Sequence, residues 1–346
     1  MEMFIGLDVS LADTAACVLD GSGQLVKEAK IESEPEALIT FLRNLPGPVT
    51  AVGLEAGPLS QWLHRCLSEA GIETVLMETR QVKGALQAMP LKTDRRDAAG
   101  IARLLQMGWF RPVHCKSVSA QEVRAVLTTR KAVQQGVVDL ELSIRGVLRN
   151  FGLKMGKVAK SRFELRVRDL IAGNAMLEAA AEPLLRARDG LRRELAQLEK
   201  QLRDLARSEP ACRLMMTMPG VGPVVALTLR AAIDDPGRFR SSKDVGPWAG
   251  LTPRRHQSGE RDVVGGITRA GDAGVRTGLF QAATVMLNRG PKTWLTAWAL
   301  RVAGRRGKKR ATVALARRIG VVLHRMWRDG TTFRVTRDAA MAAPAA

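Results

Sequence analysis

The sequence contains no tyrosine, and only 4% of its 346 residues are aromatic. Its lack of tyrosine excludes the recombinases and nickases that attack DNA through a tyrosine hydroxyl. If this chain forms a covalent bond to a phosphodiester, serine is the leading candidate for the nucleophile.

Cysteine and histidine are scarce, with four of each. The cysteines Cys17, Cys66, Cys115 and Cys212 lack the paired spacing of a zinc site or a disulfide framework. Scattered thiols are typical of a reducing compartment, so we expect a cytoplasmic protein. No apolar run approaches the roughly 18 residues of a membrane span, so we expect no membrane partner.

Acidic residues become scarce toward the end of the chain, whose formal net charge is +20. Residues 1–110 hold 10 Lys and Arg against 14 Asp and Glu, whereas residues 111–210 hold 20 against 12 and residues 211–346 hold 24 against 8. This basic excess indicates nucleic-acid binding and hence a nucleoid-associated protein. The alternative is a basic surface without such a partner.

The apolar pattern predicts several units. Short apolar runs and glycine turns in residues 1–112 predict an α/β domain with a mixed sheet. Residues 113–210 have apolar positions at helical spacing, which predicts a helical hairpin, either a coiled coil or an ordinary helical subdomain. Residues 211–333 are expected to form a mostly α domain, and residues 334–346 a disordered Ala-rich tail.

Four carboxylates of the first domain fall where a divalent-metal site needs them. Asp8 ends the first predicted strand and Glu55 ends a later one, so the two can meet at one edge of the sheet. Asp94 and Asp97 start a predicted helix and share one of its faces. Mg²⁺ or Mn²⁺ prefers such oxygen ligands, although Asp-x-x-Asp at a helix start is also a common capping pattern.

The segments FIGLDVS, VGLEAG and LKTDRRDAAGIARLL resemble, in this order, the signature of the DEDD transposases. These are the IS-one-ten family of insertion-sequence recombinases, to which Piv-type DNA invertases are related. The likeness covers residues 3–112 and 211–300, and the middle matches only in helical character. It implies a RuvC-like, RNase H-like fold for the first domain and Mg²⁺ or Mn²⁺ as cofactor. The catalytic and metal-binding quartet implied by the resemblance is Asp8, Glu55, Asp94 and Asp97.

Two further segments are candidates for phosphate binding. The turn from Pro219 to Pro223 resembles a helix-hairpin-helix turn, whose backbone N–H groups hold a phosphate without reading bases. Gly220 and Gly222 are its candidate contacts, although Pro-Gly turns are also common as structural elements. The densest basic cluster, unless it is simply a solvated surface run, supplies Arg305, Arg306, Lys308, Lys309 and Arg310.

Ser258 lies before Gly259 in a segment that, by composition alone, is a basic loop. Arginines around it could hold a phosphate through paired hydrogen bonds, the candidates being Arg254, Arg255, Arg261 and Arg269. The family carries such a Ser-Gly loop in its C-terminal domain, which implies that Ser258 attacks DNA and forms a covalent phosphoserine link. Ser241 and Ser242 compete by sequence, but their position predicts a helix cap.

The resemblance implies a transposase guided by a structured RNA. It further implies a dimer or tetramer in which the metal site of one chain meets the serine of another. The basic excess suits looped or A-form RNA as well as donor and target DNA. Three alternatives stay open: a DNA invertase that needs no guide RNA, a metal-dependent junction nuclease without a covalent step, and a non-enzymatic nucleic-acid-binding protein.

Overall fold

The chain folds into two units. The computed structural model describes residues 2–87, 93–259 and 261–336, and the units are Met1–Lys116 and Ser117–Ala346. Lys92 of the DEDD-like segment therefore lies outside the described residues. Within those residues, no helix is both long enough and apolar enough to cross a membrane.

The boundary between the units falls between Lys116 and Ser117, and each of these residues is hydrogen-bonded within its own unit. The Lys116 N–H donates to Gln61 Oε1 of the first unit at 3.2 Å. The backbone N–H and the hydroxyl of Ser117 donate to the Asp234 carboxylate of the second unit, at 2.8 and 2.6 Å. A further division of the second unit at residue 210 stays a prediction.

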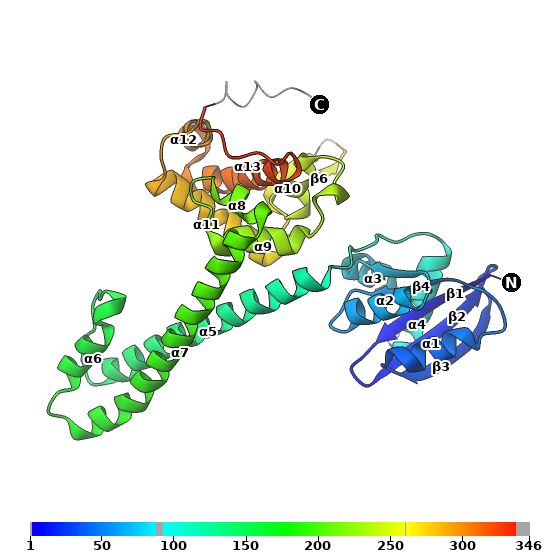
Figure 1. Ribbon diagram of the computed structural model, residues 1–346, viewed down its shortest axis with the longest axis horizontal. Helices are drawn as coiled ribbons and strands as arrows, with labels where there is room; N and C mark the ends of the chain where they lie inside the picture. Colours follow the sequence, from blue (N-terminus) through cyan, green and yellow to red (C-terminus); the bar gives the residue numbers. More distant parts are fainter. Residues whose placement is uncertain (1, 88–92, 260, 337–346) are drawn as a thin grey trace. The chain divides into compact units, whose positions relative to one another are not determined.

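The first unit is a mixed sheet between helices (Figure 1). Its strand order is β3-β2-β1-β4-β5, with β1 antiparallel to β2 and parallel to β4. The predicted α/β domain is therefore confirmed. Its elements are β1 (Met3–Val9), β2 (Asp13–Asp20), β3 (Leu25–Glu32), α1 (Pro35–Arg43), β4 (Val49–Glu55), α2 (Ser60–Glu69), β5 (Thr74–Met77), α3 (Thr79–Leu86) and α4 (Asp94–Gln106).

Side chains of β1 alternate between two layers. Ile5 and Leu7 belong to a buried cluster with leucines of α1 and α2. Gly6 lies between them and faces α4, where a Cβ would lie 2.1 Å from the Ala98 carbonyl oxygen and 2.3 Å from the Ala102 nitrogen. Because glycine has no Cβ, the backbone of α4 packs directly against β1.

The direction of α4 follows from the contacts at its end. Arg103 donates to the carbonyl of Gly23 at 3.3 Å, and Gln106 donates to that of Gly21 at 3.0 Å. This turn between β2 and β3 lies beside the start of β1, because Met3 pairs with Asp20. Helix α4 therefore runs antiparallel to β1, and its first turn lies toward the strand's end.

The second unit is mostly helical, as predicted, and includes a long helical hairpin. Helices α5 and α7 pack along each other, and the ion pairs Arg130–Glu199 (2.6 Å) and Arg188–Glu141 (2.7 Å) join them. Its elements are α5 (Val118–Asn150), η1 (Lys160–Arg162), α6 (Phe163–Ile171), α7 (Ala175–Ser208), α8 (Pro210–Met216), α9 (Pro223–Ile233), η2 (Pro236–Arg238), η3 (Ser242–Asp244), α10 (Val245–Trp248), β6 (Pro253–Ser258), β7 (Arg261–Ile267), α11 (Ala273–Arg289), α12 (Trp294–Arg306) and α13 (Lys308–Arg328).

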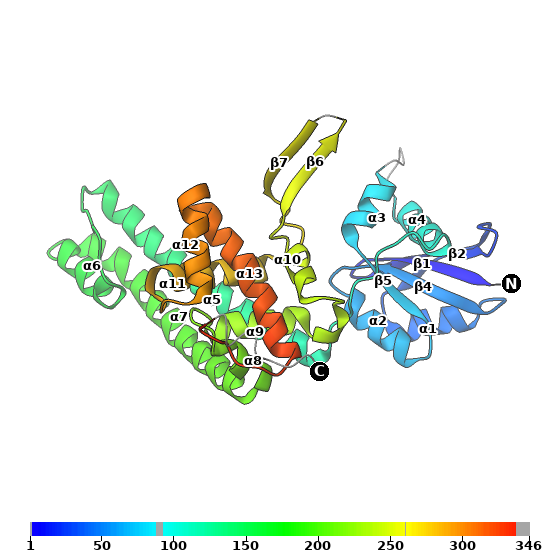
Figure 2. The same ribbon diagram turned by 90° about the horizontal axis from the view of Figure 1, so that it is seen from above.

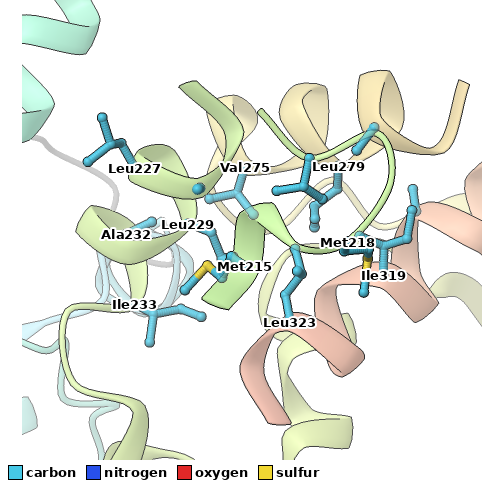
Figure 3. Packing of buried hydrophobic residues seen from close by; sticks show 14 of the residues in the cluster. Met215, Met218, Leu227, Leu229, Ala232, Ile233, Val275, Leu279, Ile319 and Leu323 are labelled. Carbon is cyan, nitrogen blue, oxygen red and sulfur yellow. The ribbon is translucent and has the colours of Figure 1, made fainter. Parts of the chain in front are cut away.

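Helices α8, α9, α11 and α13 enclose an apolar core. Figure 3 shows Met215, Leu229, Leu279 and Leu323 converging from these four helices. The chain after α13 returns to this unit, since Trp294 donates to the carbonyls of residues 334 and 335. Of the tail expected to be disordered, residues 337–346 lie outside the described part of the chain.

The close contact at Gly6 predicts a large effect of one methyl group. We expect Gly6→Ala to destabilise the first unit by about 2–4 kcal/mol, because α4 must move off the sheet. Gly21→Ala is the matched control, since its Cβ would meet nothing within 4 Å, and it should change stability by less than about 0.5 kcal/mol. Urea unfolding checks this, and equal effects of the two substitutions would contradict it.

Candidate active site

Asp8 and Glu55 stand at neighbouring positions of adjacent strands. Strands β1 and β4 are parallel, with Leu7 beside Leu54. Asp8 and Glu55 each follow one residue later, and both are half-buried. The strand order thus brings together two carboxylates that are far apart in the sequence.

Both side chains belong to the face of the sheet that α4 covers. Asp8 is two residues after Gly6, and Glu55 is two residues after Gly53. A Cβ at Gly53 would lie 3.2 Å from Cγ2 of Ile101 on α4. Side chains two residues apart in a strand share a face, so Asp8 and Glu55 follow these two glycines onto the α4 side.

Asp94 and Asp97 lie in the first turn of α4. The N-cap is Thr93, whose hydroxyl accepts a hydrogen bond from the Arg96 backbone N–H at 3.3 Å. The sequence left open whether the Asp-x-x-Asp pattern caps this helix. In the structure, Thr93 is the cap. Acidic side chains remain favourable here, because the helix N-terminus carries partial positive charge.

The first turn of α4 lies over the same rows of the sheet as Asp8. In the sheet, Asp8 pairs with Ala15 of β2, and Ala15 pairs in turn with Lys30 of β3. The pKa of Lys30 is raised, chiefly by its hydrogen bond to Asp13 and, more weakly, by the Asp94 charge. The ion pair of Arg95 with Glu28 of β3 holds the same first turn against the side of the sheet that carries Asp8.

The four predicted carboxylates therefore share one edge of the first unit. Their oxygen atoms are the hard ligands that Mg²⁺ and Mn²⁺ prefer, so this donor set fits a divalent ion. Among the described residues, no three Asp, Glu, His or Cys side chains lie close enough together to hold a metal as they stand.

Ser258 stands near the tip of an exposed two-stranded ribbon. It ends β6 and pairs directly with Arg261, the first residue of antiparallel β7. Figure 2 shows this ribbon standing out from the helices of the second unit. The sequence predicted only a loop, because neither face of the ribbon is buried and no apolar alternation marks the strands. Gly259 follows Ser258 with a φ of 54°.

The base of the ribbon is a close crossing of two glycines. A Cβ on Gly271 would lie 1.8 Å from the Trp248 carbonyl oxygen, and one on Gly250 would lie 2.5 Å from the Ala270 nitrogen. Arg276 donates hydrogen bonds to the carbonyls of Ala249 and Gly271 on the two sides of this crossing. The ribbon is therefore anchored firmly at its base.

Two of the four candidate arginines lie near this base. Arg254 donates to the Thr268 carbonyl at 3.3 Å. Arg269 has a φ of 56°, unusual for a residue other than glycine, and its N–H donates to the Gly250 carbonyl at 3.0 Å. Arg254 and the Arg269 backbone therefore take part in holding the two ends of the ribbon together.

The other two arginines lie toward the tip and differ in their partners. Arg255 makes a two-pronged ion pair with Asp262, at 2.8 and 2.7 Å. Within the part of the chain that is described, the Arg261 guanidinium has no hydrogen bond or ion pair. Asp262 is not among the residues predicted from the sequence, although a hairpin turn at Ser258-Gly259 places it across from the Arg255 strand.

The predicted helix-hairpin-helix turn joins α8 to α9. Gly220 has a φ of 86°, and a Cβ there would lie 2.5 Å from the Ala282 carbonyl oxygen of α11. Close packing alone thus requires glycine at this position. Gly222 is the N-cap of α9 and has open space around it. A phosphate contact at this turn stays a prediction.

The basic cluster spans the junction of α12 and α13. Arg305 and Arg306 end α12, and Lys308, Lys309 and Arg310 begin α13, all of them exposed. Basic side chains suit the end of a helix but oppose the positive N-terminus of the next one. An anion would relieve this repulsion in the first turn of α13, so the cluster remains a candidate for phosphate binding.

The competing serines have structural roles. Ser241 caps η3, as predicted, in a reciprocal arrangement with Asp244. Ser242 is buried, and its hydroxyl lies 2.9 Å from Nδ1 of His324. Burial lowers the pKa of His324, whose other ring nitrogen lies 3.0 Å from the Pro236 carbonyl oxygen. Of these three serines, Ser258 is the exposed one.

Comparisons with known proteins give matches in both units of the chain. Residues 5–152 match a family model described as "Transposase", and residues 212–298 match "Transposase IS116/IS110/IS902 family". The transposase for insertion sequence element IS1111A of Coxiella burnetii is 29% identical over 95% of this chain and 91% of its own length. The pilin gene-inverting protein of Moraxella bovis is 33% identical over 27% of this chain and 30% of its own.

Among solved structures, RuvC of T. thermophilus in complex with a Holliday junction substrate is similar to 33% of this chain and 100% of its own. The TM-score is 0.26 and the sequence identity 16%.

An acidic α/β unit followed by a basic helical unit, matched by transposase models in both, defines a DNA transposase, an enzyme that cleaves and transfers DNA strands. The chain belongs to the DEDD transposases of the IS116/IS110/IS902 family. Membership of this family implies DNA as a partner and dependence on a divalent metal ion.

The shared edge of the carboxylates predicts how metal affinity responds to their loss. We expect Asp8→Asn to weaken Mn²⁺ binding at least about tenfold, because an amide is a poorer ligand than a carboxylate. Asp13→Asn is the matched control, since Asp13 starts β2 at the same edge but pairs with Lys30 at 2.9 Å, and it should change affinity less than about twofold. Calorimetric titration with Mn²⁺ alone measures both variants. Equal affinities for Asp8→Asn and the unaltered protein would exclude Asp8 as a ligand.

Proposed function

We propose that this chain moves an insertion sequence by cutting DNA with the acidic site of its first unit and the serine of its second. The single observation that carries the proposal is that Asp8, Glu55 and the first turn of α4 lie at one edge of the sheet. The strand order β3-β2-β1-β4-β5, with three antiparallel strands followed by two parallel ones, supports an RNase H-like fold for this unit.

In this proposal Asp8, Glu55, Asp94 and Asp97 would hold Mg²⁺ or Mn²⁺. When bound, the divalent ions would supply Lewis-acid stabilisation of the attacking and departing oxygens. Glu55 and Asp8 project from strands, whereas Asp94 and Asp97 come from a helix held by its packing on β1 and by the hydrogen bonds of Arg103 and Gln106. The position of α4 therefore controls whether all four carboxylates can act together.

Ser258 would act as the nucleophile. Its Oγ forms a bond to phosphorus while the bond from phosphorus to one sugar oxygen breaks. The serine proton passes to a base, and the departing sugar oxygen takes up a proton. Attack by the freed hydroxyl of another strand on the phosphoserine then releases Ser258 and rejoins the DNA. The sum of bonds is unchanged, so no external energy source is needed.

The far end of the helical hairpin supports assembly into a dimer or tetramer. Large apolar side chains are exposed around it, from 56% for Leu142 to 80% for Met176, with Phe151 and Leu165 between these values. Exposed apolar side chains in such number are typical of a surface that another protein chain covers. We propose that a second copy covers them and brings a metal site and a serine from different chains together.

The proposal includes a structured guide RNA. Residues 211–346 hold 24 basic against 8 acidic residues, and the exposed cluster around Gly307 has no acidic partner among the described residues. This excess suits RNA and DNA bound at the same time. Fixed-site inversion is less well supported, because the pilin gene-inverting protein matches only 27% of the chain whereas a transposase matches 95%.

Loss of the nucleophile should abolish the reaction. We expect Ser258→Ala to lower excision of an element carrying its own ends at least about a thousandfold, because removing a nucleophile removes its pathway. Protein-linked DNA that survives SDS should disappear as well. Ser241→Ala is the matched control: it loses a cap worth about 1 kcal/mol but should keep both signals. Normal excision by Ser258→Ala would favour a metal-dependent nuclease without a covalent step.

A guide RNA should be recoverable from the protein. We expect the protein purified from cells carrying the whole element to retain one discrete RNA, encoded beside its gene and complementary to donor and target DNA. Sequencing of the RNA that survives a high-salt wash checks this. Recovery of only bulk cellular RNA fragments would contradict the guide and favour recognition of fixed sites by protein contacts.

A further inference from the structure

The register of β6 and β7 sorts the side chains of the ribbon onto two faces. Residues paired directly across two strands lie on the same face, and successive pairs alternate between faces. One face carries Ser258, Arg261, His256 and Val263. The opposite face carries Arg255, Asp262, Gln257 and Val264. Two arginines that look equivalent in the sequence therefore lie on opposite sides of the ribbon.

Arg255 forms an ion pair on its own face of the ribbon. Its Nε donates to Oδ1 of Asp262 at 2.8 Å, and its Nη2 donates to Oδ2 at 2.7 Å. This two-pronged pairing uses the same edge of the guanidinium that would bind a phosphate. The ion pair raises the pKa of Arg255 and lowers that of Asp262. Arg255 is thus directed away from Ser258 and has a carboxylate where a phosphate would bind.

Arg261 is in the opposite situation. It lies directly across from Ser258, at a spacing of about 5 Å between Cβ atoms in such a pair. Its guanidinium has no hydrogen bond or ion pair within the described residues, and the ribbon around it is exposed. A phosphate at the Ser258 hydroxyl would therefore lie within reach of the Arg261 guanidinium.

We propose that Arg261 binds the phosphate that Ser258 attacks, and that Asp262 is a positioning residue that occupies the guanidinium of Arg255 and keeps it from reaching that phosphate. Arg261 would donate two hydrogen bonds to the non-bridging oxygens and offset the negative charge that grows as Oγ attacks. It exchanges no proton with the DNA. The inference rests on the proposed role of Ser258 and adds to it the identity of the phosphate ligand.

Arg261 and Arg255 form a matched pair for the test. Each substitution to Ala removes one exposed positive charge from the same ribbon, so general attraction to DNA should fall equally, about twofold to threefold. Binding of a random 30-base-pair duplex, measured by fluorescence anisotropy, checks that equality. We expect Arg261→Ala to lower formation of protein-linked DNA about a hundredfold and Arg255→Ala less than about fivefold. Arg261→Lys keeps the charge but not the fork, and should recover only part of the loss.

The yield of protein-linked DNA can distinguish a positioning role of Asp262 from a purely structural one. We expect Asp262→Ala to lower protein-linked DNA about tenfold, because the released Arg255 competes for the phosphate. Adding Arg255→Ala to Asp262→Ala removes the competitor and should restore the yield to within about threefold. If Asp262 only held the ribbon in register, the double variant would stay as low as Asp262→Ala, which would overturn the positioning role.

Ser258→Ala, tested alongside, separates the two levels of the proposal. If Ser258→Ala still forms protein-linked DNA, the proposed function fails. If it forms none, but Arg261→Ala and Arg255→Ala lose the same fraction of activity, the serine assignment stands and the role of Arg261 is overturned. A hundredfold loss confined to Arg261→Ala supports both.

Discussion

The direct contact between the backbone of α4 and strand β1 is the constraint on which the acidic site depends. Gly6 has no Cβ, so Ala98 and Ala102 approach the strand more closely than any side chain would allow. Hydrogen bonds from Arg103 and Gln106 to the β2–β3 turn then set how far α4 lies along the strand. With the helix placed in this way, its first turn lies at the edge where β1 and β4 end. The packing of α4 on β1 thus brings the carboxylates of both elements to one edge of the sheet.

The segment that carries Ser258 has no such packing to hold it. An isolated two-stranded ribbon is only marginally stable in water. The crossing of Gly250 and Gly271 and the hydrogen bonds from Arg276 hold the ends of the ribbon. Nearer the tip, the ion pair between Arg255 and Asp262 ties the strands together without burying either side chain. The ribbon can therefore present Ser258 to a large ligand and still keep a defined register.

The two units differ in charge as well as in fold. A cluster of carboxylates repels a DNA backbone unless cations intervene, so the acidic first unit needs metal before it can approach a phosphate. The second unit, with 24 basic against 8 acidic residues in its last 136 positions, attracts nucleic acid by itself. In the proposed function, nucleic-acid binding and metal-dependent chemistry thus fall to different parts of the chain.

Much of this could be predicted from the order of residues. Apolar alternation, glycine turns and helical spacing identified the mixed sheet and the long helices, because each pattern reports burial within one element. The acidic positions at strand ends and at a helix start, together with the Ser-Gly segment, indicated the family before any fold was known. Local sequence carries such information because strands and helices expose their periodicity residue by residue.

Other features were decided only by tertiary structure. The ribbon was invisible in the sequence, since both of its faces are exposed and no periodicity results. The contrast between Arg255 and Arg261 depends on cross-strand register, which a slip of one residue would reverse. Thr93 rather than Asp94 caps α4, which follows from backbone geometry at that one position. Each of these depends on which segments meet in space, and pairings between distant residues leave no mark in either segment taken alone.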